Sequence, residues 1–438
     1  QEYFLIDRSL ALTRPDLLLT GRTLIGHAPS KGQELNDHYF GSIPSRVSVF
    51  LKELEYECSF LGIPIKTRHN EVAPSQYEVA PVFENANLAV DHNTLLMEIM
   101  NKIASKHNFT VLFHEKPFDK INGSGKHTNW SLSTNNGVNL LSPGKTPMSN
   151  LQFLSFFINT IAAILKHEEL IRASTVSASN DLRIGQNDAP SAMLSVYIGQ
   201  HLLQVLDDLE NVTKGKLSPE EKTDLKLNVI GKIPEILLDN TDRNRTSPIA
   251  FTGNKFEFRT VGSKANCAKL TTVLNAIVTE QLIEFKIAVD GLIDSKKMKK
   301  DDAIFNILRE MITSVKKVLS EGNNGIVEGK SIRKSKALSE YKTSPEALPA
   351  YIKKSSVALF ESLDILTSNE LSARYQVDLE AYVSTLQIES RTLGDMARNH
   401  IIPTAIRYQN MLIENIRGLK EIYGDKFKSY AGEQLLIL

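Results

Sequence analysis

Hydrophobic and polar positions follow two different periods in the first 275 residues. Short runs of β-branched and aromatic residues, bounded by Gly, Pro and Asn, predict strands at residues 3–7, 64–69, 75–83, 110–114, 127–133 and 255–260. Two longer stretches, residues 93–107 and 151–171, repeat apolar side chains at helical spacing. This mixture predicts an α+β domain.

The pattern changes after residue 275, where strand-like runs fade and long helical periodicity takes over. Apolar residues from Leu371 to Ile401 recur at steps of three, four or seven, which places them on one face of a long helix. We expect Ser368 to be its N-cap and Pro403 to kink or break it. A second helical run covers residues 408–422. The apolar stripe favours intramolecular packing or subunit contact.

Composition excludes several classes of protein and of partner. The 438 residues are 42% hydrophobic and 23% charged, as in ordinary globular proteins, which argues against disorder and fibres. Lys plus Arg and Asp plus Glu both number 51, so no net field favours nucleic acid or an anionic membrane. The longest uncharged run, residues 146–165, contains too many polar side chains to predict a membrane span. Cys58 and Cys267 lack metal-site spacing and are too few for a disulfide framework, which favours a reducing compartment.

The run of residues 255–259 alternates charged and aromatic side chains. As a strand it places Lys255, Glu257 and Arg259 on one face and two phenylalanines on the other. Two cations beside a carboxylate, above an apolar back, can bind a polyanion or a metal. An amphipathic edge strand with a solvated charged face is the alternative.

A second polar row follows two turn dipeptides at residues 122–125. The next strand directs His127, Asn129 and Ser131 to one face and Trp130 to the other. A buried polar row is costly unless it meets a ligand, although a surface hairpin would also explain the pattern.

Two glutamates, Glu71 and Glu78, follow His69 across a turn that Pro74 imposes. The two carboxylates can converge only through tertiary folding. Such hard oxygen ligands suit Mg²⁺ or Mn²⁺ better than Zn²⁺. The alternative is that both glutamates are ordinary surface residues.

Two loops carry arginines that could bind phosphate or carboxylate oxygens. Residues 179–190 include Arg183 and have the polar composition of a lid, and residues 242–247 include Arg245. Each could instead be a surface salt-bridge loop. Neither a Walker A loop nor a Rossmann glycine fingerprint is present, so a nucleotide would be held in another way.

Taken in this order, these stretches resemble glutamine synthetase, specifically its long type III form. The matching elements are Glu2 within residues 1–7, His69 to Pro74, Glu78, residues 122–127, Arg183 with Asp188-Ala189-Pro190, residues 244–246 and residues 255–259. The resemblance implies an α+β, antiparallel-sheet catalytic domain of the glutamine synthetase/guanido kinase type over residues 1–290. An all-α type III extension would follow over residues 291–438. The family's N-terminal β-grasp domain is expected to be absent from this chain.

The same resemblance implies a ligase of nitrogen assimilation and glutamine biosynthesis. It would join L-glutamate and ammonia to give L-glutamine through a γ-glutamyl phosphate, using ATP and Mg²⁺ or Mn²⁺. It would work in the cytoplasm as a ring-shaped homo-oligomer, with hexameric rings stacked as a dodecamer, and with neither nucleic acid nor membrane as a partner.

Site residues follow from the resemblance, position by position. One metal would be held by Glu2, Glu71 and Glu78, and a second by His127 and Glu257. Glutamate would be held by Asn122, Gly123, Arg183 and Arg259. ATP would meet His69, Asn129, Ser131, Arg245 and Lys255, and Asp188 on the flap would bind ammonium. Asp188, Arg183, Arg245 and Glu257 would be the catalytic residues.

Some positions depart from the family pattern. The first glutamate of the family's Glu-x-Glu strand would fall just before Gln1, Asp188 stands where other types carry glutamate, and Lys255 replaces an arginine. Two alternatives therefore stay open. One is a ligase of the same fold that joins glutamate to an amine or polyamine, and the other is a non-catalytic structural or regulatory homologue.

Overall fold

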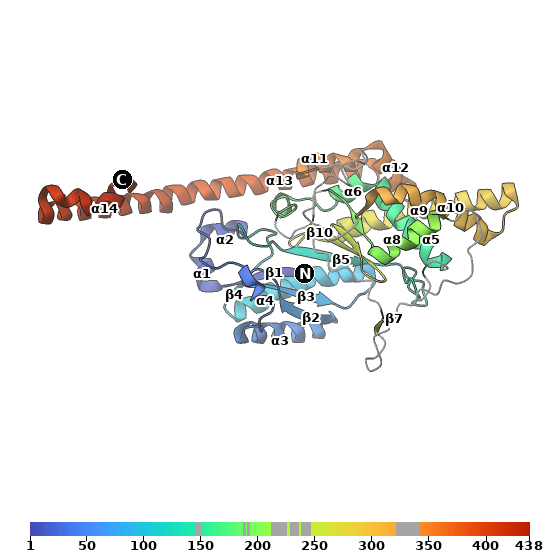
Figure 1. Ribbon diagram of the computed structural model, residues 1–438, viewed down its shortest axis with the longest axis horizontal. Helices are drawn as coiled ribbons and strands as arrows, with labels where there is room; N and C mark the ends of the chain where they lie inside the picture. The colour runs from blue at the N-terminus through green and yellow to red at the C-terminus, as the bar shows by residue number, and fades with distance from the viewer. Residues whose placement is uncertain are drawn as a thin grey trace.

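The computed structural model (Figure 1) describes residues 1–144, 147, 150–186, 190, 193–211, 226–227, 236–237, 247–320 and 341–438. Two residues of the expected site, Asp188 and Arg245, lie outside the described residues.

The first of two central sheets is antiparallel, with strand order β2-β3-β1-β4. Its strands are β1 Glu2–Asp7, β2 Ile65–Asn70, β3 Gln76–Pro81 and β4 Phe109–Leu112. In this register Glu2 and His69 both stand opposite Glu78, one on each side. The pairing therefore sets three candidate site residues in a row across three neighbouring strands.

The second sheet has the order β11-β6-β9-β10-β5. Its strands are β5 Gly125–Trp130, β6 Val196–Tyr197, β9 Ile249–Phe251, β10 Phe256–Gly262 and β11 Leu319–Ser320. The three strands that carry no site residue, β11, β6 and β9, pair in parallel, so the expectation of a wholly antiparallel fold is wrong at that edge. The site strands β5 and β10 are antiparallel. A separate pair, β7 Lys226–Leu227 and β8 Ile236–Leu237, is also antiparallel.

Helices cover both sheets. Their bounds are α1 Arg8–Leu12, α2 Pro15–Thr20, α3 Ser45–Phe60, α4 Ala86–Lys106, α5 Leu151–Lys166, α6 Glu168–Ala173, α7 Ala178–Asp181, α8 Gln200–Asn211, α9 Ala268–Lys296, α10 Lys300–Val315, α11 Ser344–Ala347, α12 Lys354–Ser362, α13 Ser368–Met396, α14 Ile402–Tyr423 and α15 Gly432–Ile437. Apolar residues of α3 and α4 pack with the apolar face of the first sheet. A larger core joins α5, α9 and α10 to the second sheet.

The predicted mixture of strands and helices is confirmed in the first part of the chain. All six predicted strands are present within a few residues of their expected bounds. The predicted helix over residues 151–171 is broken at His167, which ends α5 and precedes α6. Helix α9 runs through residue 290, where the sequence places the domain boundary. Phe305 and Leu371, beyond that boundary, belong to the same core as the second sheet.

The C-terminal part is helical, and its last helices extend well beyond the body of the protein (Figure 1). Helix α13 is capped by Thr367 through a capping box, so the expected Ser368 cap is one residue out of place. The regular α-helix is interrupted just before Pro403, as expected: a π-helical turn at Ala397–Ile401 separates α13 from α14, and Pro403 lies in the first turn of α14. Leu371 is buried, whereas Val377 is 62% exposed.

No described helix combines the length and the apolar character that crossing a membrane would require.

Candidate functional site

A row of acidic residues and histidine crosses the first sheet at one end. The side chain of His69 on β2 lies beside Glu78 on β3, with His69 Nε2 2.8 Å from Glu78 Oε2. Glu71, just after β2, has its Oε1 3.4 Å from His69 Nδ1. Tertiary folding thus brings Glu71 and Glu78 together around the turn at Pro74, because one imidazole contacts both carboxylates.

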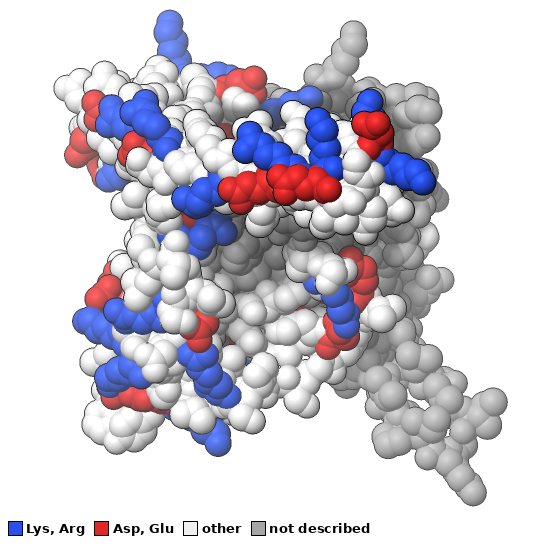
Figure 2. Space-filling view, turned by 90° about the vertical axis from the view of Figure 1, so that its left-hand side faces the viewer, with Lys and Arg blue, Asp and Glu red and all other residues white. Residues whose placement is uncertain are grey.

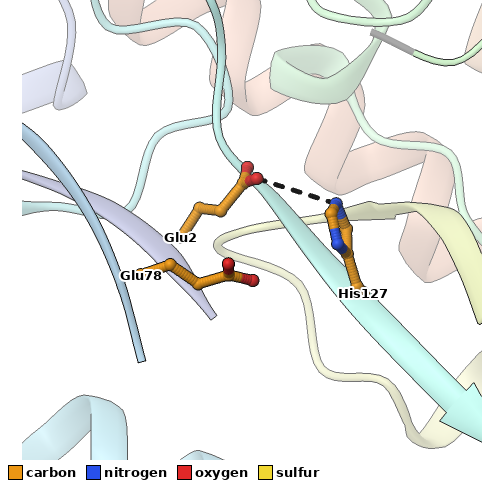
Figure 3. Close-up of side chains that lie close together, drawn as sticks. All are labelled: Glu2, Glu78 and His127. Atoms are coloured by element: carbon orange, nitrogen blue, oxygen red, sulfur yellow. Dashed lines mark ion pairs between the residues drawn. The ribbon is translucent and has the colours of Figure 1, made fainter. Parts of the chain in front are cut away.

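The second sheet brings another group to the same place. His127 on β5 lies between two carboxylates, with its Nε2 3.6 Å from Glu2 Oε1 and its Nδ1 3.8 Å from Glu257 Oε1 on β10. Figure 3 shows the Glu2 carboxylate directed at the His127 ring, with Glu78 beside it. The site therefore lies where the two sheets meet, and neither sheet could build it alone.

The donor atoms form two overlapping groups that could each hold a divalent cation. Glu2, Glu78 and His127 form one group, and His69, Glu71 and Glu78 form the other, with ligand atoms within 4.8 Å of one another in each. Carboxylates this close repel one another unless a cation or proton lies between them. The donor set of oxygens with one imidazole fits Mg²⁺ or Mn²⁺. The sharing of Glu78 between the groups was not apparent from the sequence.

The pKa values of His69 and Glu78 are both shifted, because the two side chains lie on neighbouring strands and form a hydrogen bond. The hydrogen bond to Glu78 raises the pKa of His69 well above its usual value. Burial alone would raise the pKa of Glu78, but the bond from His69 and nearby positive charges hold it far below its ordinary range. In the absence of a metal ion, the bond between His69 and Glu78 therefore favours the charged form of both groups.

The strand β10 has the alternation that the sequence predicts. Phe256 and Phe258 are fully buried in the larger core, and Glu257 and Arg259 lie on the opposite face. The guanidinium Nε of Arg259 donates to Glu257 Oε1 at 2.6 Å. Lys255 lies just before the strand and its Nζ is 3.5 Å from the carbonyl of Thr252.

The strand β5 also alternates as predicted. Trp130 is buried and donates its indole N–H to Asn275 Oδ1 at 3.0 Å, whereas Asn129 is exposed. The hydroxyl of Ser131 donates to the carbonyl of Asn254 and lies beside the loop that precedes β10. The residues expected near the nucleotide therefore lie at the end of β5 away from the Asn122–Gly125 loop.

The loop Asn122–Gly125 joins the two sheets. The backbone N–H of Gly125 donates to Glu2 Oε2 at 2.5 Å. A Cβ at Gly123 would lie 2.3 Å from the carbonyl oxygen of Glu115, and one at Gly125 would lie 2.5 Å from Arg183 Nη1. Both positions therefore admit only glycine without a shift of their surroundings.

Arg183 lies beneath this loop and is only 3% exposed. Its Nε donates to Asn180 Oδ1, and its Nη2 donates to the carbonyl oxygens of Arg259 and Val261 at 3.0 and 3.1 Å. The guanidinium is thus fixed to strand β10 and packs closely against Gly123 and Gly125 of the loop.

Three further residues shape the site and were not singled out from the sequence. Gln76 donates to the carbonyl of Gly123 and to Ser124 Oγ, and the buried Glu115 accepts the backbone N–H of Lys264. Gln33 contacts Asn122 from the connection between α2 and α3. The sequence does place the polar Gln76 within a predicted strand, which could have marked it as a candidate, whereas no local pattern distinguishes Gln33.

The surface around the end at which α14 projects carries both signs of charge. Figure 2 shows lysine and arginine side chains interspersed with aspartate and glutamate on this face, which is hollowed between its upper and lower halves. The visible face therefore has no large patch of a single sign that would suit a nucleic-acid backbone.

Comparisons with known proteins give a consistent result. A family described as "Glutamine synthetase, catalytic domain" matches residues 1–189, and one described as "Glutamine synthetase C-terminal domain" matches residues 303–420. The chain is 54% identical over 427 residues to a glutamine synthetase of Bacteroides fragilis, covering 97% of this chain and 58% of that protein. It is 42% identical over 420 residues to a type-3 glutamine synthetase of Dictyostelium discoideum, covering 96% and 56%.

A solved structure of Plasmodium falciparum glutamine synthetase has a similar fold, with a TM-score of 0.51 at 15% identity, over 80% of this chain and 61% of that one. The chain spans little more than half the length of the Bacteroides fragilis and Dictyostelium discoideum proteins.

Proposed function

The chain belongs to the glutamine synthetase family, and on that premise we propose that it joins ammonia to L-glutamate with ATP as the energy source, giving L-glutamine. One observation carries the proposal. Glu2, Glu78, His127 and Glu257 converge from four strands of two sheets, beside the glycine-containing loop at residues 122–125.

The chemistry explains why a charged site of this kind is needed. A carboxylate is unreactive toward ammonia, because it has no good leaving group. Transfer of the γ-phosphoryl group of ATP to the γ-carboxylate forms a P–O bond and releases ADP, and ammonia then forms the C–N bond while phosphate leaves. Negative charge accumulates on the phosphoryl oxygens, so cations and oriented donors are the groups that accelerate transfer.

When bound, Mg²⁺ or Mn²⁺ held by carboxylates and the imidazole from among Glu2, Glu71, Glu78, His127 and Glu257 would offset that charge. In this proposal Arg245 and Lys255 face the phosphates, His69 lies near the γ-phosphate, and Asn129 and Ser131 lie near the nucleotide.

Glutamate would be bound by Asn122, Gly123 and Arg259. Arg183, which the sequence assigns to the same task, would shape this pocket from behind, because it is buried and its Nε and Nη2 donate to Asn180 Oδ1 and to the carbonyl oxygens of Arg259 and Val261. Asp188 would bind ammonium and shield the acyl phosphate from water.

We further propose a division of the chain into two domains, a ring-shaped assembly and a cytoplasmic location. Residues 1–290 would carry the catalytic groups and residues 291–438 the helical extension. The family relationship is the basis for proposing self-association into stacked hexameric rings, and exposed apolar side chains on α13 and α14, including Val377, Ile402 and Met411, support a contact surface there. The unpaired Cys58 and Cys267 are consistent with a cytoplasmic location. Light scattering on the purified protein tests the assembly, since a monomer at micromolar concentration would contradict it.

The activity is tested by measuring phosphate release from ATP with L-glutamate, Mg²⁺ or Mn²⁺, and either ammonium or a panel of amines. We expect ammonium to be preferred and glutamine to appear in equal amount to phosphate. Glu257→Gln should abolish turnover, whereas Glu98→Gln, an exposed change on α4, should not. Preference for a bulky amine would point to an amine ligase, and absence of both turnover and Mn²⁺ binding would point to a non-catalytic homologue.

A further inference from the structure

A short helix connects the C-terminal helical part of the chain to Arg183. Helix α7, Ala178–Asp181, ends two residues before Arg183, and its Asp181 Oδ2 accepts the backbone N–H of Ser344 at 2.7 Å. Ser344 is the first residue of α11, 163 positions further along the chain. We propose that Asp181 is a positioning residue for L-glutamate, through which the C-terminal helical part fixes Arg183 behind the glutamate pocket. The inference rests on the proposed function.

Helix α7 is too short to hold its own orientation. A single helical turn fixes several backbone angles for very few hydrogen bonds, so it is stable only where tertiary contacts support it. From the catalytic part of the chain, the carbonyl oxygens of Thr175 and Thr260 both accept Asn180 Nδ2 at 2.8 Å. From the C-terminal part, Ser344 donates to Asp181. Two neighbouring residues of α7 are therefore held by two different parts of the chain.

The segment that holds Asp181 is itself anchored on α6. The hydroxyl of Tyr341 donates to Glu169 Oε1 at 2.7 Å, and Lys353 Nζ also pairs with Glu169. Arg172 Nε donates to the carbonyl of Tyr341 at 3.3 Å. Loss of the Asp181 contact should therefore leave residues 341–353 in place, so that the change falls on α7.

The charges at this junction are poorly satisfied. Asp181 Oδ1 lies 4.0 Å from Arg172 Nη2, and both side chains are largely buried. Within the described part of the chain, Asp181 Oδ1 and the two Nη atoms of Arg172 have no hydrogen-bond partner. Burial of charged groups in this state costs folding free energy, and such a pair contributes little to stability. The geometry that the pair sets between α6, α7 and α11 is a better explanation of its presence than stability.

A displacement of α7 would reach the glutamate pocket through Arg183. The backbone N–H of Arg183 donates to the carbonyl of Asn180, and its Nε donates to Asn180 Oδ1, both at 3.0 Å. A Cβ at Gly123 would lie 2.9 Å from Arg183 Cγ, and one at Gly125 would lie 2.5 Å from its Nη1. Because the arginine packs directly against the loop that carries Asn122, a small rotation of α7 would be passed on to that loop.

Ser344→Pro removes the one N–H that Asp181 accepts. Proline is well tolerated at the first residue of a helix, and Thr343 already has the extended conformation that a residue before proline adopts, with φ −122° and ψ 155°. The matched control is Lys354→Pro, at the exposed first residue of α12, which follows the extended Lys353. It places a proline at the same helical position in the same part of the chain and leaves the Asp181 contact intact.

Asp181→Ala removes the acceptor of the same bond. Because this change and Ser344→Pro delete one shared contact, their effects should not add in the double variant. An effect that came from the bulk of the proline would instead persist in the Asp181→Ala background. Ser344→Pro decides the question by itself if Asp181→Ala does not fold.

The experiment measures steady-state kinetics for glutamate and for ATP on the purified wild type and the four variants. We expect KM for glutamate to rise about tenfold in Ser344→Pro, in Asp181→Ala and in the double variant, as loss of one hydrogen bond to a charged acceptor implies, and to be unchanged in Lys354→Pro. The kcat and the KM for ATP should stay within about twofold of the wild type. A merely structural role would instead lower the amount of active enzyme, and hence kcat, without changing either KM.

An unchanged glutamate KM in Ser344→Pro, an equal rise in Lys354→Pro, or additive effects in the double variant would overturn the inference while leaving the proposed function intact. A wild-type protein that neither binds glutamate nor releases phosphate would overturn both.

Discussion

A single methyl group at Gly125 should disturb both the stability of the protein and its metal site. In Gly125→Ala the new Cβ would lie 2.5 Å from Arg183 Nη1 and 3.0 Å from its Cζ. The first distance is about 0.9 Å inside the 3.4 Å at which ordinary contact begins. Arg183 cannot simply move away, because its Nε and Nη2 donate to three buried acceptors.

The cost follows from the bonds that must yield. Loss of one hydrogen bond from a charged group costs about 1.5–3 kcal/mol, and overpacking of a rigid interior about 1–3 kcal/mol. We therefore expect the free energy of unfolding to fall by about 3 kcal/mol. Because the Gly125 N–H donates to Glu2 Oε2, the same shift should weaken Mn²⁺ binding by about tenfold or more.

Urea denaturation at fixed protein concentration and Mn²⁺ calorimetry measure the two effects. The control is Gly26→Ala, since a Cβ at Gly26 would meet nothing within 4 Å. If Gly125→Ala unfolds at the same urea concentration as Gly26→Ala and binds Mn²⁺ as tightly, the assignment of Arg183 as a rigid support of the loop is wrong.

Three further predictions concern metal and pH. Glu78→Gln removes the carboxylate shared by both donor groups and should lower Mn²⁺ affinity, measured by calorimetry, by about 100-fold. The control Glu98→Gln, at an exposed position, should not change the affinity, and equal affinities of the two variants would refute the sharing of Glu78. Adding Mn²⁺ at one hundred times its Kd should raise the unfolding free energy by about 2.7 kcal/mol, and a chelator should reverse the gain, as thermal unfolding would show. Burial, together with nearby cations, lowers the pKa of His114 from 6.5 to about 3, so the unfolded chain binds a proton that the native protein refuses between these values. The free energy of unfolding should therefore decrease as the pH falls below 6.5, by about 2 kcal/mol at pH 5. His114→Asn should remove this pH dependence, whereas His400→Asn, a change at an exposed histidine, should retain it.

Local sequence pattern was sufficient for the faces of the strands that carry the site. Phe256 and Phe258 alternate with charged residues, and burial of the two rings fixes which face Glu257 presents. Trp130 does the same for His127 on β5. In such strands the hydrophobic effect selects one face for the core, so the chemistry of the other face can be read without the fold.

In the C-terminal part, local pattern predicted the helices better than it predicted the contacts between them. Pro403 predicts an interruption of the long helix, and the structure has one directly before it, where a π-helical turn separates α13 from α14. The change of hydrophobic pattern at residue 275 marks where strands become rare. Helix α9 nevertheless continues past residue 290, where the sequence places the domain boundary, and packs into the core beneath the second sheet. Composition thus describes elements and not the contacts between them.

The sequence by itself determined the strands, their faces and the chemical character of the donors, because each depends on side chains a few residues apart. Only the tertiary structure decided which donors meet. The register of β1, β2 and β3 sets Glu2 and His69 on either side of Glu78, the junction of the two sheets brings His127 to Glu2, and a loop contact across 89 positions places Gln33 on Asn122. These contacts are set by the packing of apolar faces far from the charged groups, and no local pattern of the charged residues encodes them.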